Sequence, residues 1–287
     1  MTPATPKGTL YVIATPIGNL EDITLRALRL LEQVDLIVAE DTRHSKRLLD
    51  HFSISTPFAS SHYQGVERQR VSGVLRLLTA GKTLALISDA GTPLVSDPGY
   101  PLVKAAISAG VTVVPVPGAT AFVAALVKSG FPTDRFTFDG TPPKKATARR
   151  AYFASLRGEG RTVVLYESCH RVKQTLETLL TVLPRRPLAL CRELTKLHEE
   201  ALWGTAGELL KVLQSREALK GEYVLLVGGA QDDERSDGWA ALSVAEHVEQ
   251  LIEQGIERKA ALKAVAARRG LSKREVFTEV ERAKGRS

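Results

Sequence analysis

The segment at residues 88–100, Ser-Asp-Ala-Gly-Thr-Pro-Leu-Val-Ser-Asp-Pro-Gly-Tyr, most constrains what this chain can fold into. It follows an apolar run at residues 82–87 that is typical of a buried strand, and it precedes residues 101–109, which we expect to form a helix. Paired glycines, prolines and aspartates in so short a loop favour tight turns, close backbone approach to a ligand and fixed carboxylates. An ordinary strand-to-helix connection needs only a few residues and one turn former. We therefore expect a ligand site at this strand end, where open α/β sheets bind their ligands.

Strand, loop and helix patterns alternate along the first half of the chain. We expect strands at residues 9–14, 34–39, 82–87 and 111–114, and each runs into a loop of polar or turn-forming residues. Asp22 or Thr24 is expected to cap the first helix, and further helices are expected at residues 45–52 and 64–80. The alternation favours a parallel α/β sheet.

A second α/β unit is expected after the Pro-rich basic segment at residues 139–145, which we interpret as a linker or as a loop over a site. Its expected strands lie at residues 161–166, 188–191 and 221–228, with a helix ending near Val182 and another within residues 204–213.

The last part of the chain has a helical pattern. A polar stretch at residues 231–238 is expected to be a linker, and Ser243 and Ser272 each begin a capping-box pattern. Three short helices with many basic residues could bind nucleic acid or form a solvated helical cap, and the sequence leaves both open. The basic residues are Arg258, Lys259, Lys263, Arg268, Arg269, Lys273 and Arg274.

Composition narrows the function classes. The 287 residues include 44% hydrophobic and 25% charged residues, which is typical of a globular protein, and no apolar run reaches membrane-spanning length. The chain begins without an apolar stretch, so we expect no secretory signal. Cys169 and Cys191 form no CxxC pair, which argues against a disulfide framework or a Cys-rich zinc site and fits a reducing cytoplasm. The net charge of +7 suggests a polyanionic partner.

Common catalytic motifs are absent from the sequence. It has no strand followed by GxGxxG, no Walker A lysine motif, no HExxH, no EF-hand pattern and no GxSxG elbow. We therefore expect no metal site, and the remaining candidates are loops at strand ends that could clamp a small polar ligand.

Four motifs in order carry a family resemblance. They are Glu-Asp-Thr-Arg-His at residues 40–44, the segment at residues 88–100, Tyr-Glu-Ser-Cys-His-Arg at residues 166–171 and Arg-Glu-Leu-Thr-Lys at residues 192–196. Together they resemble the tetrapyrrole methylase superfamily over residues 9–227. Within it they look like the branch that methylates a cytidine ribose 2′-hydroxyl in 16S ribosomal RNA, and the helical tail resembles the C-terminal extension of that branch.

The resemblance implies a fold, a cofactor and a set of binding residues. It implies two α/β domains, at residues 1–117 and 118–230, with the cofactor S-adenosylmethionine in the cleft between them, and a linker with a helical extension at residues 231–287. It also suggests a homodimer. The cofactor-binding residues that it implies are Ser88, Asp89, Ala90, Gly91, Thr92, Pro93, Asp97, Pro98, Pro117, Gly118, Ala119, Thr120, Tyr166, Glu167, Ser168, Leu194 and Thr195. Tyr223 is a weaker candidate.

The reaction that the resemblance implies requires few side chains. A sulfonium methyl is already activated, so in-line positioning supplies much of the rate, and a nearby acceptor can take the proton of the ribose hydroxyl. The candidate acceptors are Glu40, Asp41, His44 and Glu167. Each has a structural alternative, such as Asp41 capping a helix or Glu167 pairing with Arg171. The candidate RNA-binding residues are Arg43, Lys144, Lys145, Arg149, Arg150 and Arg171, whose alternative is a solvated basic face.

Three functions remain open at the level of sequence. The first is an S-adenosylmethionine-dependent 2′-O-methyltransferase that acts on 16S rRNA in the small ribosomal subunit. The second is a small-molecule methylase of the same superfamily, acting on a corrin or diphthine-type substrate. The third is a non-catalytic RNA-binding assembly protein that retains the fold.

Overall fold

The computed structural model describes residues 7–59, 67–230, 242–253 and 255–284. The chain divides into two compact units. The first comprises Met1–Ala154 and Arg161–Gly229, and the second comprises Ser155–Gly160 and Ala230–Ser287. The stretch predicted as a linker, residues 231–238, lies outside the described residues, and the three-domain division predicted from the sequence stays a prediction.

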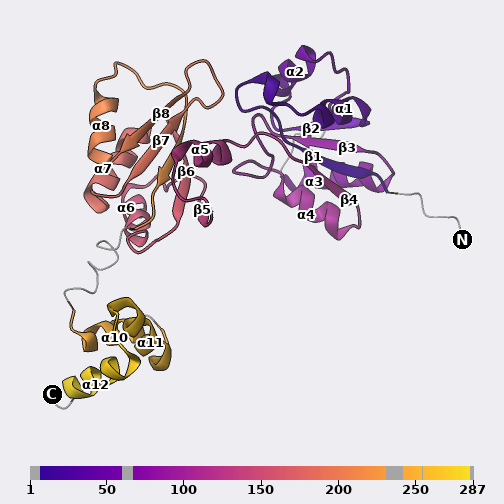
Figure 1. Cartoon of the computed structure of the whole chain (residues 1–287). Coiled ribbons are helices and arrows are strands. Elements are labelled where there is room, and N and C mark those ends of the chain that lie inside the picture. Colours follow the sequence, from indigo (N-terminus) through magenta and orange to yellow (C-terminus); the bar gives the residue numbers. More distant parts are fainter. Residues whose placement is uncertain (1–6, 60–66, 231–241, 254, 285–287) are drawn as a thin grey trace, which may run out of the picture. The chain divides into compact units, whose positions relative to one another are not determined.

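The first unit begins with a four-stranded parallel sheet (Figure 1). Its strands are β1 (Thr9–Ile13), β2 (Leu36–Ala39), β3 (Leu84–Ile87) and β4 (Thr112–Val116). They are ordered β2-β3-β1-β4, and every neighbouring pair is parallel. The parallel sheet that strand and helix alternation predicted is therefore confirmed.

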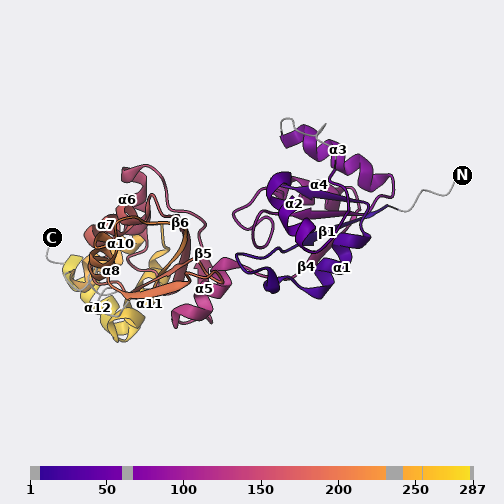
Figure 2. The same ribbon diagram turned by 90° about the horizontal axis from the view of Figure 1, so that it is seen from above.

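Helices cover both faces of this sheet. Helices α1 (Leu25–Gln33) and α2 (Thr42–His51) pack on one face, against a core that includes Ile13 and Ile37. Helices α3 (Glu67–Thr79) and α4 (Tyr100–Ser108) pack on the other, against Leu10 and Leu84. Figure 2 shows α1 and α3 on opposite sides of the sheet. This is the doubly wound arrangement, in which near-continuous apolar strands are buried on both faces.

The connections set a reversal point between β1 and β3. The chain leaves β1 through the short 3₁₀ helix η1 (Leu20–Asp22) for α1, where the Thr24 hydroxyl accepts a hydrogen bond from the Ala27 N–H at 3.1 Å. It leaves β3 for α4, on the opposite face. Because β1 and β3 are adjacent, their connections run to opposite faces of the sheet at neighbouring strand ends. Doubly wound sheets bind ligands at such a reversal point.

The second sheet of this unit is mostly antiparallel. Its strands are β5 (Phe136–Phe138), β6 (Thr162–Ser168), β7 (Leu188–Arg192), β8 (Glu200–Gly204) and β9 (Glu222–Val227). The order is β5-β6-β9-β7-β8, in which only β5 and β6 are parallel. Helix α5 (Ala121–Ser129) packs on one face with Val164 and Leu226. The other helices are α6 (Ala146–Ser155), α7 (Val172–Val182) and α8 (Ala206–Gln214).

Several of these elements differ from the sequence-based expectation. Helices α5 and α6 and strands β5 and β8 were not expected, and β6 runs two residues further, through Ser168. Strand β5 has only three residues, and β8 is a partly exposed edge strand, so neither has a strong apolar pattern. The antiparallel direction of β9 follows from tertiary pairing, which sequence periodicity does not encode.

The three C-terminal helices have a core of their own. Helices α10 (Val244–Glu253), α11 (Arg258–Arg269) and α12 (Lys273–Lys284) bury one face each, and together they form a cluster that includes Leu251, Val265 and Val276. Both predicted capping boxes are confirmed, because Ser243 and Ser272 each exchange hydrogen bonds with a glutamate three residues later. None of the helices in the described part of the chain has the length and apolar character needed to cross a bilayer.

Because each of the two units has its own hydrophobic core, we expect a core substitution in one unit to destabilise that unit alone. Replacing Leu251, which is 4% exposed in the helical core, by Ala should lower the stability of the second unit by about 2–5 kcal/mol. Amide hydrogen exchange should then accelerate in α10–α12 and stay unchanged in β6 and β9. The matched variant Leu165→Ala, in strand β6, should accelerate amide exchange in β6 and β9 and leave exchange in α10–α12 unchanged. Equal acceleration in both units with either variant would contradict two independent cores.

Candidate functional site

A pocket of about 430 Å³ lies in the first unit at the carboxyl edge of its parallel sheet. All four loops that leave this sheet contribute to it, because parallel strands end at one edge. They supply Ile17 after β1, Glu40 after β2, residues 89–92 and 95–97 after β3 and Thr120 after β4. The pocket volume is in the range of small-molecule sites.

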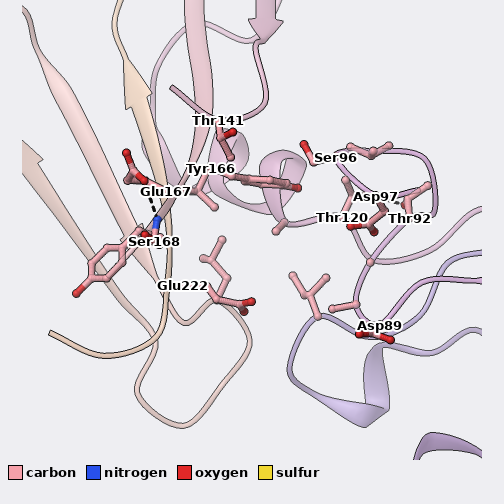
Figure 3. A pocket seen from close by; sticks show the side chains of 18 of the residues that line it. Asp89, Thr92, Ser96, Asp97, Thr120, Thr141, Tyr166, Glu167, Ser168 and Glu222 are labelled. Carbon is pink, nitrogen blue, oxygen red and sulfur yellow. Dashed lines mark hydrogen bonds between the residues drawn. The ribbon is translucent and has the colours of Figure 1, made fainter. Parts of the chain in front are cut away.

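The second sheet supplies further lining residues. Tyr166, Glu167 and Ser168 come from the end of β6, and Glu222 and Tyr223 from the start of β9. The antiparallel register places these two ends side by side, with Glu167 opposite Tyr223 and Ser168 opposite Glu222. Figure 3 shows Tyr166, Ser168 and Glu222 among the pocket residues, together with Asp89, Thr92 and Asp97.

Backbone hydrogen bonds fix the loop at residues 88–100 against its neighbours. The Thr15 N–H donates to the Gly91 carbonyl at 2.8 Å, and the Gly91 N–H donates to the Thr15 carbonyl at 3.0 Å. Gly91 has φ +83°, a conformation that side chains rarely adopt, which explains the glycine at this turn. The Thr92 hydroxyl lies 2.6 Å from that of Thr120, which ties the same loop to the residues before α5.

Unusual backbone conformations concentrate in the pocket loops. Non-glycine residues of the described chain with positive φ are Ser53, Leu94, Ser96, Glu193 and Thr195. All except Ser53 lie in the loop at residues 88–100 or in the segment at residues 192–196. Such conformations cost free energy and cluster at ligand-binding sites, so both loops have the character of preorganised binding segments.

The pocket is acidic on the side of the first sheet. Burial raises the pKa of Glu40, and the nearby Asp97 and Asp89 carboxylates raise it further. Burial also raises the pKa of Asp97, with Asp89 adding to the effect against a hydrogen bond from Ser88. Among the residues that the structure describes, no cation pairs with any of these three carboxylates, so the cluster favours a positively charged ligand.

Carboxylates on the second sheet have a cation beside them. The Lys196 ammonium group donates to Glu193 at 2.9 Å and to Glu222 at 3.0 Å. The Glu167 side chain is fully buried, and it accepts hydrogen bonds from the Thr175 hydroxyl at 2.5 Å and from the Ser168 N–H at 2.9 Å. The Arg171 guanidinium lies 3.6 Å from the same carboxylate. Glu167 therefore fixes the end of β6 to α7.

Most of the predicted cofactor residues line the pocket or support it. The lining residues among them are Asp89, Ala90, Gly91, Thr92, Asp97, Thr120, Tyr166, Glu167, Ser168 and Leu194. Ser88 and Pro98 line a neighbouring apolar cavity of about 100 Å³, which Glu40 also borders. The remaining predicted residues, Pro93, Pro117, Gly118, Ala119 and Thr195, lie in the same loops without lining the pocket.

The predicted proton acceptors separate into two groups. Glu40 and Glu167 line the pocket, whereas Asp41 and His44 do not. Asp41 caps α2 by accepting from the Arg43 N–H at 2.8 Å, and its pKa is well below the usual range because the Arg43 side chain hydrogen-bonds to it. Asp41 thus has the capping role that was its structural alternative.

The predicted RNA-binding residues also differ in exposure. Lys144, Lys145 and Arg150 are exposed, and so is the Arg43 side chain, although it is paired with Asp41. Arg149 is only 5% exposed and donates to the Lys144 carbonyl and the Thr178 hydroxyl, so its guanidinium is not placed to meet a phosphate. Arg171 is partly buried and donates to the Pro142 carbonyl at 2.7 Å.

Sequence reasoning missed several lining residues. They are Ile17, Val95, Ser96, Ala121, Thr141, Glu193, Lys196, Glu222 and Val224. Ser96, Glu193 and Lys196 lie inside the motifs at residues 88–100 and 192–196, so the sequence indicated their loops but not these residues. Glu222 lies at the start of a strand, which comes to the ligand edge only because β9 is antiparallel.

Comparison with known proteins places the chain in a family. The model of the tetrapyrrole (corrin/porphyrin) methylases matches residues 9–210. The ribosomal RNA small subunit methyltransferase I of Halalkalibacterium halodurans is 46% identical over 274 residues, which are 94% of each chain. Curated proteins of the same name from Synechocystis and Bacillus subtilis match over a similar share.

Solved structures agree with the fold. The uroporphyrin-III C-methyltransferase of Thermus thermophilus is 25% identical with a TM-score of 0.55, over 77% of this chain and 94% of the other. A structure of the Thermus thermophilus enzyme complexed with S-adenyl homocysteine has a TM-score of 0.52 at 21% identity, over 77% of this chain and 97% of the other. The chain therefore belongs to the tetrapyrrole (corrin/porphyrin) methylases, in the branch whose curated members are named ribosomal RNA small subunit methyltransferase I.

Proposed function

We propose that this protein transfers the methyl group of S-adenosylmethionine to the 2′-oxygen of a cytidine ribose in 16S rRNA of the small ribosomal subunit. The observation that carries the substrate class is the extent of the match. The curated rRNA methyltransferase relative aligns over 94% of this chain, including residues of the C-terminal helical unit. The uroporphyrin methylase covers only 77%. That difference favours RNA over a tetrapyrrole.

The pocket fits the proposed cofactor by its chemistry. Ile17, Leu194 and the Tyr166 ring offer apolar surface for the adenine, and the Glu40, Asp89 and Asp97 carboxylates suit the sulfonium charge.

Positioning supplies most of the catalysis. When bound, the cofactor provides an activated methyl on a sulfonium sulfur, which is released as a thioether. Loop residues 89–97 and Thr120, held by the Thr15–Gly91 and Thr92–Thr120 contacts, keep the site rigid, so that a ribose oxygen can approach in line. The carboxylates of Asp89 and Asp97 would attract the sulfonium charge of the bound cofactor, which contributes to its affinity and not to the rate, because that charge is lost as the methyl transfers.

Glu40 is the proton acceptor that we propose for the ribose hydroxyl. It lines the pocket at the end of β2, and its raised pKa makes its carboxylate a stronger base than an ordinary glutamate. Thr175, Ser168 and Arg171 hold the Glu167 carboxylate, and Arg43 holds that of Asp41, so both have structural partners among the side chains of their own segments. Lys144, Lys145 and Arg150 are proposed to hold RNA phosphates. The homodimer and the cytoplasmic location stay predictions.

The acidic pocket predicts a pH-dependent preference for the charged cofactor. Because the pKa values of Glu40 and Asp97 are raised in the free protein, these groups become protonated at a higher pH than ordinary carboxyls do. S-adenosylmethionine should therefore lose affinity relative to S-adenosylhomocysteine as the pH falls from about 8 to about 4, the ordinary range of carboxyl groups, measured by calorimetry. Asp97→Asn should flatten this change in the affinity ratio, whereas Asp134→Asn, an exposed control outside the pocket, should leave it intact. A wild-type ratio independent of pH would refute the electrostatic role.

Substitution of the acceptor should affect turnover more than binding. Glu40→Gln should lower kcat by about 10²-fold or more, with cofactor affinity within severalfold of wild type. Asp41→Asn should leave kcat close to wild type. Glu167→Gln should lower the melting temperature and change kcat less than Glu40→Gln does. If Asp41→Asn and Glu40→Gln reduce kcat equally, the assignment to Glu40 is wrong.

The product should be a single methylated ribose. Small ribosomal subunits from a strain lacking this gene, incubated with the protein and methyl-labelled cofactor, should gain one methyl at a cytidine 2′-oxygen. A 2′-deoxy substitution at that nucleotide should abolish incorporation, because the nucleophile is removed. Label on a base atom or on a tetrapyrrole would identify a different methylase, and cofactor-independent subunit binding without label would identify an assembly protein.

A further inference from the structure

The second unit contains two packed helices, α11 and α12, that are joined by a short turn. Helices α11 and α12 are joined by the three residues Gly270, Leu271 and Ser272. Gly270 adopts φ +65° and ends α11, and Ser272 begins α12 through its capping box with Glu275. Two packed helices joined by a short turn containing glycine form the arrangement in which nucleic-acid-binding proteins present the second helix to a groove.

Charge is segregated between the helices of this unit. Helix α10 carries Glu246, Glu249 and Glu253 and no lysine or arginine, whereas α11 has no acidic residue. The basic residues of α11 are Arg258, Lys259, Lys263, Arg268 and Arg269. A cap that only needed solvation would not require this separation, so it favours an anionic partner for α11. The neighbouring α12 has four basic and three acidic residues and therefore a net charge of +1.

Helix α12 presents a basic face, which we define as Lys273, Arg274, Phe277, Thr278 and Arg282. All five are exposed, and Phe277 exposes 49% of its surface. With 3.6 residues per turn, Arg274, Thr278 and Arg282 recur on the side of the helix opposite its buried positions. Phe277 lies at the edge of that side, and Lys273 is exposed in the first turn. Those buried positions are Val276 and Val280.

Helix α12 also carries three acidic residues, Glu275, Glu279 and Glu281, and partners engage two of them. Glu281 lies on the same side of the helix, but its carboxylate accepts a hydrogen bond from the Arg258 guanidinium at 2.7 Å, which offsets its charge. Glu275 is engaged by the Ser272 N–H at 2.7 Å. An exposed aromatic ring between cations and a hydroxyl is the composition that binds phosphates together with a sugar or base, since cations attract the phosphates and the ring contacts the apolar surfaces.

We propose that the basic face of α12 is a second RNA-binding surface, which holds a structured segment of the ribosomal RNA substrate apart from the methyl-transfer pocket. Lys273, Arg274 and Arg282 contact phosphates, and Phe277 packs on a sugar or an unpaired base. The choice of RNA rests on the proposed function, and the charge separation and exposed ring support a nucleic acid independently of it.

The test measures binding without methyl transfer, in the full-length protein. The probe is the small ribosomal subunit without its methyl group, titrated at several salt concentrations. The triple variant Lys273→Ala, Arg274→Ala, Arg282→Ala should bind about tenfold more weakly or worse. The plot of log affinity against log salt concentration should become less steep, by about 0.9 in slope for each phosphate that the variant no longer neutralises. Cofactor affinity should not change. The charge-matched control Arg29→Ala, Arg76→Ala, Lys211→Ala removes exposed cations from α1, α3 and α8 and should bind as wild type.

Phe277→Ala separates the aromatic contact from charge. It should weaken subunit binding by about fivefold or more without changing the salt slope, because stacking releases no counterions. Wild-type affinity and salt slope in the triple variant would overturn the proposal, and so would an equal weakening in the control variant. Equal effects of the triple variant on an RNA hairpin and on a DNA duplex of the same sequence would show a general nucleic-acid surface and overturn the assignment to RNA. If the wild type binds subunits through α12 but transfers no methyl, only the proposed function fails.

Discussion

The pair of backbone hydrogen bonds between Thr15 and Gly91 is the interaction on which the pocket depends. It joins the loops that leave β1 and β3 at the point where their connections part to opposite faces of the sheet. Backbone bonds of this kind position a loop without using side chains, which leaves Asp89 and Asp97 available to a ligand. A side chain at Gly91 would strain the turn at φ +83° and press on Ile17, 3.3 Å away. The same constraint thus gives both the rigidity and the polarity of the site.

Acidic and basic residues lie on different parts of the molecule. The chain carries a net charge of +7, yet the first-sheet side of its pocket holds three carboxylates, two of them with raised pKa values. Clustered desolvated carboxylates cost stability, and in return they make a binding site selective for a cation. The basic residues lie elsewhere, on exposed positions such as Lys144 and Lys145 and on the α11–α12 side of the helical unit. A cationic cofactor and a polyanionic substrate would therefore meet different surfaces of one chain.

The sequence motifs identified the loops well and the individual roles less well. The segment at residues 88–100 contributes lining residues as its turn formers indicated, because glycine and proline constrain the backbone locally. Arg149 and Glu167 have the right chemical groups for RNA binding and proton transfer, but both are buried and hydrogen-bonded to other side chains, Thr178 and Thr175. The spacing of Glu167 and Arg171 indicated that they could pair, whereas the burial of both residues follows from packing and no motif reveals it.

Local patterns determined the alternation of strands and helices that indicates a parallel sheet, the strand-end loops and the capping boxes at Ser243 and Ser272. The family was indicated by short motifs that follow one another in order along the chain. Only the tertiary structure decided which of those loops meet. Strand β9 runs antiparallel to β6 and β7, and this direction brings Glu222 and Tyr223 to the edge where Tyr166 and Glu193 lie. Strand direction follows from long-range pairing and side-chain packing, which a single sequence does not display.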